Sequence, residues 1–180
     1  MACNLVGGIP LGCRDNAGGV KTVWITDWDN IESITVNSND PLTGSVVTNI
    51  SGTGVFYQFD LIRTTSEVVE NINASLPNGT VYYEQNLTTF FAKLEQYKRN
   101  ILKALAQSQR MGVVIETNNG SYWLLGETYG CFVSGGSTNT GKALGDATGY
   151  NINLQGLEPN PMAELSGPLD SILSGMTISF

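Results

Sequence analysis

Hydrophobic and polar residues alternate with a period of two over much of the chain, which is typical of half-buried β-strands. The longest case is segment 55–63, where Val55, Tyr57, Phe59 and Leu61 take every second position. β-Branched and aromatic residues between Asn, Asp, Gly or Pro clusters mark the other strands. We expect these at about residues 21–26, 31–36, 46–50, 67–76, 80–91, 113–115, 122–125, 131–134 and 149–156.

Two short sequences between these segments are typical of tight turns. Residues 76–79 (LPNG) combine a proline with Asn-Gly, and Asn119-Gly120 separates two apolar segments. Both favour the positive φ angles of hairpin turns. We expect a hairpin around Asn119-Gly120, and we expect segment 67–76 to pair with segment 55–63.

One segment, from about Ala92 to Gln109, has the period of an amphipathic α-helix. Its polar face contains residues such as Lys93, Gln96, Arg99 and Lys103. Its apolar residues, spaced three or four apart, are Leu94, Tyr97, Ile101, Leu102 and Leu105. The pattern predicts a single helix laid on a sheet.

The order of these elements predicts one mainly β (α+β) domain, for which 180 residues are sufficient. Residues 1–20 lack periodicity and predict an extended N-terminal arm. Residues 21–161 would form the β domain, with a long polar loop at 135–148. Residues 162–180 would be a C-terminal extension with a short helical turn at 169–173.

Charge and hydropathy exclude several classes of protein. Sixteen acidic and nine basic residues give a net charge of -7, whereas nucleic-acid binding requires a basic surface. The apolar runs are far shorter than a membrane span, which needs roughly 20 residues. The N-terminus has no basic region before its apolar residues, so we expect no secretory signal.

The chain has no histidine, the commonest general base and metal ligand. Cys3, Cys13 and Cys131 lack the spacing of a zinc or redox motif. We expect reduced, packed thiols, with a Cys3–Cys13 disulfide as the less favoured alternative. We therefore expect no enzymatic activity, no catalytic residues, no metal and no cofactor.

Residues 136–142 (GSTNTGK) match a phosphate-binding loop as far as Lys142. The next residue should be Ser or Thr to hold magnesium, but it is Ala143. A strand, rather than a helix, is expected to follow. An ordinary polar loop is favoured, with Lys142 as a surface or intersubunit contact.

The acidic residues suggest two further kinds of site. Asp27 with Asp29, or Glu67 with Glu70, could act as acid and base. A calcium site is the other possibility, but its candidate residues lack the order of a calcium-binding loop; they are Asp27, Asp29 and Asn30, with Asn37, Asn39 and Asp40 nearby. Solvated turns explain these residues better.

Aromatic residues and glycosylation motifs have ordinary explanations too. Trp24, Trp28, Trp123 and the pair Tyr82-Tyr83 could form a stacking platform for a ligand, but core packing is favoured. Asn-x-Ser/Thr motifs occur by chance in a chain this rich in those residues. They begin at Asn49, Asn73, Asn78, Asn86 and Asn119.

Several longer sequences resemble the tail tube proteins of tailed bacteriophages, in particular a group with a cysteine-containing N-terminal arm. They are CNLVGGIPLGCRDNAGGVKTVWITDWDNI near the N-terminus, VYYEQNLTTFFAKLEQYKRNILKALAQSQ, NNGSYWLLGETYGC and GGSTNTGKALGDATGYNINLQGLEPNP. The resemblance covers most of the chain up to about residue 161.

This resemblance implies two packed antiparallel sheets, a β-sandwich or barrel, with one flanking helix. It also implies a structural virion protein that is made in the host cytoplasm and forms stacked hexameric rings around a channel for genome delivery. DNA would pass through without specific binding, which agrees with the acidic charge. The arm and loop 135–148 would contact neighbouring subunits. Segments 80–91 and 113–125 would supply core strands, and the helix would be seated by Leu94, Ile101, Leu102 and Leu105.

Further expected partners are a sheath where one is present, the tape measure, the terminator and the baseplate. Two alternatives stay open. One is a tail terminator, connector or baseplate-hub protein that forms a single ring. The other is a carbohydrate-binding or adhesion β-sandwich that uses exposed aromatic residues.

Overall fold

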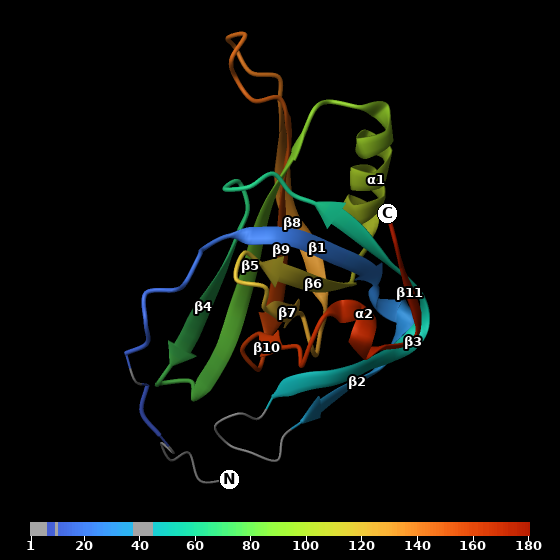
Figure 1. Ribbon diagram of the computed structural model, residues 1–180. Helices are drawn as coiled ribbons and strands as arrows, with labels where there is room; N and C mark the ends of the chain where they lie inside the picture. The colour runs from blue at the N-terminus through green and yellow to red at the C-terminus, as the bar shows by residue number, and fades with distance from the viewer. Residues whose placement is uncertain (1–6, 10, 38–44) are drawn as a thin grey trace.

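The computed structural model describes residues 7–9, 11–37 and 45–180 (Figure 1). Within these ranges the strands are β1 (Val20–Asp27), β2 (Ile31–Asn37), β3 (Val46–Asp60), β4 (Glu67–Ser75), β5 (Thr80–Ala92), β6 (Met111–Thr117), β7 (Tyr122–Leu125), β8 (Cys131–Asn139), β9 (Gly149–Glu158), β10 (Ala163–Glu164) and β11 (Leu173–Ser179). The helices are α1 (Gln96–Gln107), α2 (Leu169–Ile172) and the 3-10 turn η1 (Trp28–Asn30). The predicted mainly β fold with one long helix is confirmed.

The described strands belong to one hydrogen-bonded sheet, where the resemblance implied two. Its main order is β11-β3-β1-β6-β8-β9-β5-β4, with β2 on β3, β7 on β6 and β10 on β7. Neighbouring strands run antiparallel except β11, which runs parallel to β3. The sheet is not closed into a barrel, so β4 remains at an edge.

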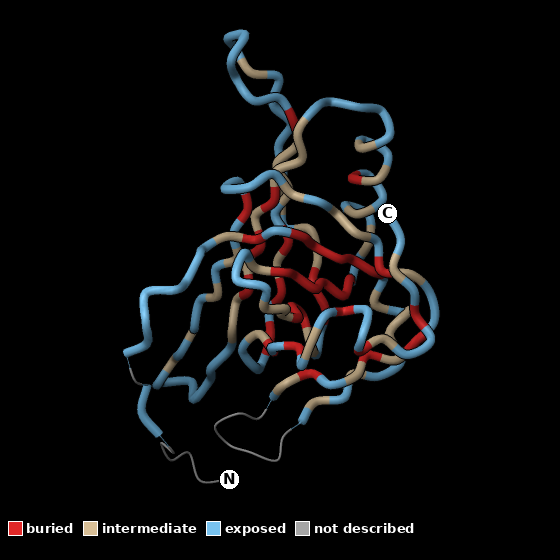
Figure 2. The backbone as a smooth tube through the Cα atoms, in the orientation of Figure 1, coloured by how far each residue is buried: buried red, intermediate tan, exposed pale blue. Residues whose placement is uncertain are grey.

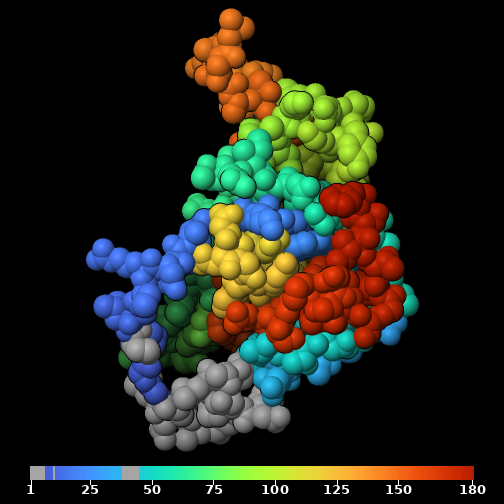
Figure 3. Space-filling model, in the orientation of Figure 1, coloured from blue at the N-terminus to red at the C-terminus, as the bar shows by residue number. Residues whose placement is uncertain are grey.

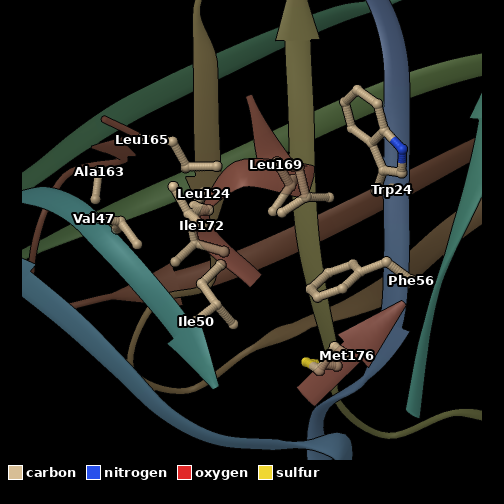
Figure 4. Close-up of a cluster of buried hydrophobic side chains, with 11 residues drawn as sticks. Trp24, Val47, Ile50, Phe56, Leu124, Ala163, Leu165, Leu169, Ile172 and Met176 are labelled. Carbon is tan, nitrogen blue, oxygen red and sulfur yellow. The ribbon is translucent and has the colours of Figure 1, made fainter. Parts of the chain in front are cut away.

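Strands β1 and β6 lie at the centre of the molecule and are buried on both faces (Figure 2). Trp24 and Val114 face one hydrophobic cluster, which Figure 4 shows. Their chain neighbours Val23, Ile25 and Val113 face a second cluster on the other side. Alternate residues of a strand point to opposite faces, so these two strands join both halves of the core.

The residues after Met162, which the sequence predicts as an extension, contribute to the first cluster. Leu169 in α2 is 1% exposed, and Ile172 and Met176 are also buried. Strand β11 then pairs with β3 along its length. The predicted helical turn at 169–173 is confirmed as α2, and this segment covers one side of the core.

One predicted strand boundary and one predicted pairing differ from the structure. The predicted strands at 46–50 and 55–63 are one strand, β3, which continues through Gly52 and Gly54 and ends at Asp60. Strand β3 pairs with β1, β2 and β11, whereas β4 pairs with β5 around the turn at 76–79. The prediction that segment 67–76 pairs with segment 55–63 is therefore wrong, because the short turn brings β4 to the strand that follows it.

Helix α1 is shorter than the predicted range 92–109. Strand β5 continues to Ala92, which pairs with Gly149, and Lys93 has a φ of 66° that breaks the strand. Glu95 and Ser108 flank the helix with extended backbone. Leu102 is buried, but Leu94 and Tyr97 are exposed, so Leu94 does not help to seat the helix.

None of the helices in the described ranges is long and apolar enough to cross a membrane.

Candidate interaction surfaces

The hairpin of β8 and β9 projects beyond the rest of the molecule (Figure 1). Its strands pair from Cys131–Gly156 out to Asn139–Gly149. Strand β8 therefore extends through residues 135–139, and the predicted loop 135–148 is shortened to residues 140–148. Leu144 at the tip is fully exposed. The projecting hairpin therefore presents one large apolar side chain at its end.

Asp146 fixes the shape of the hairpin tip. Its Oδ2 accepts hydrogen bonds from the backbone N–H groups of Lys142 at 2.7 Å and Ala143 at 2.8 Å. These two bonds lower the pKa of the Asp146 carboxyl. In a phosphate-binding loop such N–H groups would face the phosphate. Here a carboxylate of the same loop occupies them, which agrees with the polar-loop interpretation of residues 136–142.

Strand β4 forms an open edge of the sheet. Among the described strands it pairs with β5 alone. Val69 and Ile72 on this strand are 45% and 68% exposed, and Leu76 in the following turn is 96% exposed. An edge strand offers unpaired backbone groups to another strand, and proteins usually protect it with lysine or proline. Neither residue occurs in β4.

Strands β4, β5, β9 and β8 contain no lysine or arginine. Their solvent-facing side is rich in amides, and the strand register places Gln155 beside Asn86. Gln155 Nε2 donates to Glu84 Oε1 at 2.7 Å, and Asn73 Nδ2 donates to Glu84 Oε2 at 3.4 Å. Without cations, this four-stranded face has little attraction for phosphate.

A buried polar network lies on the opposite side of these strands. Gln85 and Glu158 are each 1% exposed. Gln85 Oε1 accepts from the Gly126 N–H at 2.9 Å, and Gln85 Nε2 donates to Glu70 Oε2 at 3.2 Å. Glu158 accepts from the backbone N–H groups of residues 128 and 129. The network fastens the turn between β7 and β8 to the sheet, and the sequence patterns did not identify it.

One member of each carboxylate pair proposed from the sequence has a partner outside the pair. Asp27 accepts from Ser108 Oγ at 3.4 Å, and Glu70 belongs to the polar network. Glu67 lies at the open edge and is exposed. In the described part of the chain, no group of three acidic, cysteine or histidine residues could hold a metal ion.

The three tryptophans do not form a common platform. Trp24 packs in the first cluster and its ring lies 5.8 Å from that of Tyr122. Trp123 packs against the second cluster. Trp28 is covered by the Arg110 guanidinium at 4.9 Å. Core packing, the favoured interpretation, accounts for Trp24 and Trp123.

The cysteines differ in environment. Cys131 is a buried free thiol, and burial raises its pKa. Cys13 is free and exposed on the N-terminal arm. Cys3 lies outside the described residues, and so does the alternative of a Cys3–Cys13 disulfide.

Comparisons with known proteins give no relative: no family model matches the chain, no curated protein matches it, and no solved structure matches it.

Proposed function

We propose that this protein is a structural subunit of a bacteriophage tail tube, which assembles into stacked rings. The main support is the position of its exposed apolar side chains. Ile9 and Leu11 on the arm and Leu144 at the hairpin tip are all fully exposed. Each lies on a segment that extends away from the core (Figure 1). A subunit that completes its burial by assembly would have this distribution.

The open edge at β4 and the cation-free face next to it also support this function. Unprotected edge strands are suited to pairing between subunits. A face with carboxylates and amides but without lysine or arginine could lie beside DNA without binding it. The subunit would thus form the wall of a passage and perform no catalysis.

Negative-stain electron microscopy of the purified protein, combined with its molar mass from light scattering, tests this function. Long tubes with a central channel support it. Single closed rings would instead support a terminator, connector or baseplate-hub protein. A protein that stays monomeric at every concentration and binds immobilised glycans would contradict both and favour a carbohydrate-binding module.

A further inference from the structure

An open apolar groove of about 700 Å³ lies between helix α1 and strands β1 and β3. Leu102 and Leu105 line its helix side, and Ile25 and Phe59 line its sheet side. The Phe59 ring lies 5.7 Å from that of Phe91 on β5. The volume and apolar lining of the groove are within the range of ligand-binding clefts.

Exposed aromatic side chains surround this groove. Tyr57, Tyr97 and Phe180 all line it and are 53%, 67% and 80% exposed. Aromatic residues that stay exposed beside an apolar groove are characteristic of the central part of a protein interface. The groove is therefore poorly covered in the isolated subunit.

The N-terminal arm has the complementary property. Ile9 and Leu11 are fully exposed, and residues two apart lie on the same side of an extended segment. An arm that binds in extended form could therefore insert both apolar side chains into the groove together.

The base of the arm is fixed at the end of the molecule away from the groove. The Ala17 N–H donates to Asn119 Oδ1 at 2.6 Å, and Asn118 Nδ2 donates to the Gly18 carbonyl at 2.7 Å. The arm thus leaves the fold beside the start of β1, whereas the groove begins at the other end of β1, at Ile25. Figures 1 and 3 show the arm and helix α1 on opposite sides of the molecule.

One charge of the arm, that of Arg14, is complementary to the groove, whereas the adjacent Asp15 has the sign of the groove. Asp27 and Asp60 line the groove, and neither forms an ion pair within the described residues. Arg14 on the arm is exposed and has no ion-pair partner there either. Lys98, the cation of the groove, is already paired with Glu95 at 2.9 Å.

From these observations we infer that the groove under α1 binds the N-terminal arm of a second copy of this chain, with Ile9 and Leu11 inserted and Arg14 near one of the two aspartates. Asp60 lies opposite Thr22, and Asp27 lies at the other end of β1. Because the arm and the groove that would bind it lie on opposite sides of the subunit, the contact between copies is head-to-tail. Such a contact produces rings or filaments. This inference rests on the proposed function and assigns one of its subunit contacts.

Disulfide trapping tests the contact. The substitutions Leu11→Cys and Ala104→Cys, made in a chain with Cys3→Ser and Cys13→Ser, place one thiol on the arm and one on the groove wall. Oxidation should give a ladder of covalent dimers and larger species on a non-reducing gel. The matched control keeps Ala104→Cys but carries Leu76→Cys in place of Leu11→Cys. Leu76 is 96% exposed in the β4–β5 turn, and this control should give no ladder. A link within single chains, or linkage no greater than in the control, would overturn the inference.

A second variant, Ile9→Asp with Leu11→Asp, separates this inference from the proposed function. Both side chains are fully exposed, so the fold should persist, while loss of two buried apolar groups should weaken association roughly ten- to hundredfold. If the aspartate variant still forms rings or tubes as the wild type does, and the cysteine variant gives no cross-linked ladder, the proposed function stands and this contact is excluded. A wild-type protein that never associates would contradict both.

Discussion

The Glu158 carboxylate, which is 1% exposed, accepts a hydrogen bond from the backbone N–H of Tyr129 at 2.8 Å. Its second oxygen accepts from the Thr128 N–H at 2.9 Å. One side chain of β9 thereby satisfies two backbone groups of the turn that leads into β8. The projecting hairpin begins at this turn, so the bond links the core to a candidate interaction surface.

Replacing Glu158 by Gln should destabilise the protein. The amide retains one acceptor and presents an N–H group to the other backbone N–H, which leaves a buried donor without a partner. We expect the free energy of unfolding to fall by about 1–3 kcal/mol, measured by urea denaturation. Glu164→Gln, at an exposed position of β10, is the control and should change little. Equal losses in the two variants would contradict the role of Glu158.

Stability should depend on pH through Glu127. Burial raises the pKa of its carboxyl, and the nearby charge of Glu158 raises it further. The folded state then binds this proton more tightly than the unfolded state, so the contribution of Glu127 to stability falls as pH rises above about 4.3, the ordinary value for Glu. Glu127→Gln should raise the urea midpoint at pH 7, and this gain should shrink as pH approaches 4.

Glu95 provides the opposite case. Its hydrogen bond and ion pair with Lys98 lower its pKa. Its small stabilising contribution is present at neutral pH and is lost as pH falls through the lowered pKa. Glu95→Gln should therefore lower the midpoint slightly at pH 7. If Glu127→Gln and Glu95→Gln both raise, or both lower, the urea midpoint at pH 7, the opposite pKa shifts assigned to these two residues are contradicted.

Gly52 should not tolerate a side chain. A Cβ atom at this position would collide with the backbone carbonyl oxygen of Asn30, which must then move together with the turn between β1 and β2. Gly52→Ala should lower the free energy of unfolding by roughly 1–3 kcal/mol, measured by chemical denaturation. Gly135→Ala is the control, because its Cβ would meet nothing within 4 Å. Similar stability of the two variants would exclude this close approach.

The C-terminal segment should be necessary for folding. Leu169 is 1% exposed in the first cluster, so Leu169→Ala should lower the free energy of unfolding by about 2–5 kcal/mol. Leu144→Ala removes the same atoms from an exposed site and should leave stability unchanged. If thermal denaturation shows no difference between the two, the C-terminal residues are not part of the core.

Shortening the hairpin tip should affect assembly and leave the fold intact. Residues 141–147 carry the exposed Leu144 but lie beyond the Asn139–Gly149 pair that closes the ladder. Replacing them by a short turn should abolish tubes in electron microscopy, while circular dichroism keeps the wild-type signal. Tubes of normal length from this variant would show that the tip makes no essential contact.

The sequence alone determined the local elements. Alternation along β1, β5 and β9 and the Asn119-Gly120 turn depend on residues close together in the chain, and the hairpin of β6 and β7 forms as predicted. The short α2 turn was also predictable. These features follow from steric preferences and from a period of two, which neighbouring residues are sufficient to establish.

Tertiary structure decided which strands pair and which surfaces remain open. Strand β3 pairs with its neighbour in sequence, β2, but also with β1 and with β11 from the other end of the domain. The groove under α1 depends on Phe59 and Phe180, which no local pattern relates. Burial of Glu158 also depends on a distant turn. Which distant strands become neighbours in the sheet depends on burying the apolar surface of the whole domain together. Patterns among residues that are near each other in sequence do not specify this pairing.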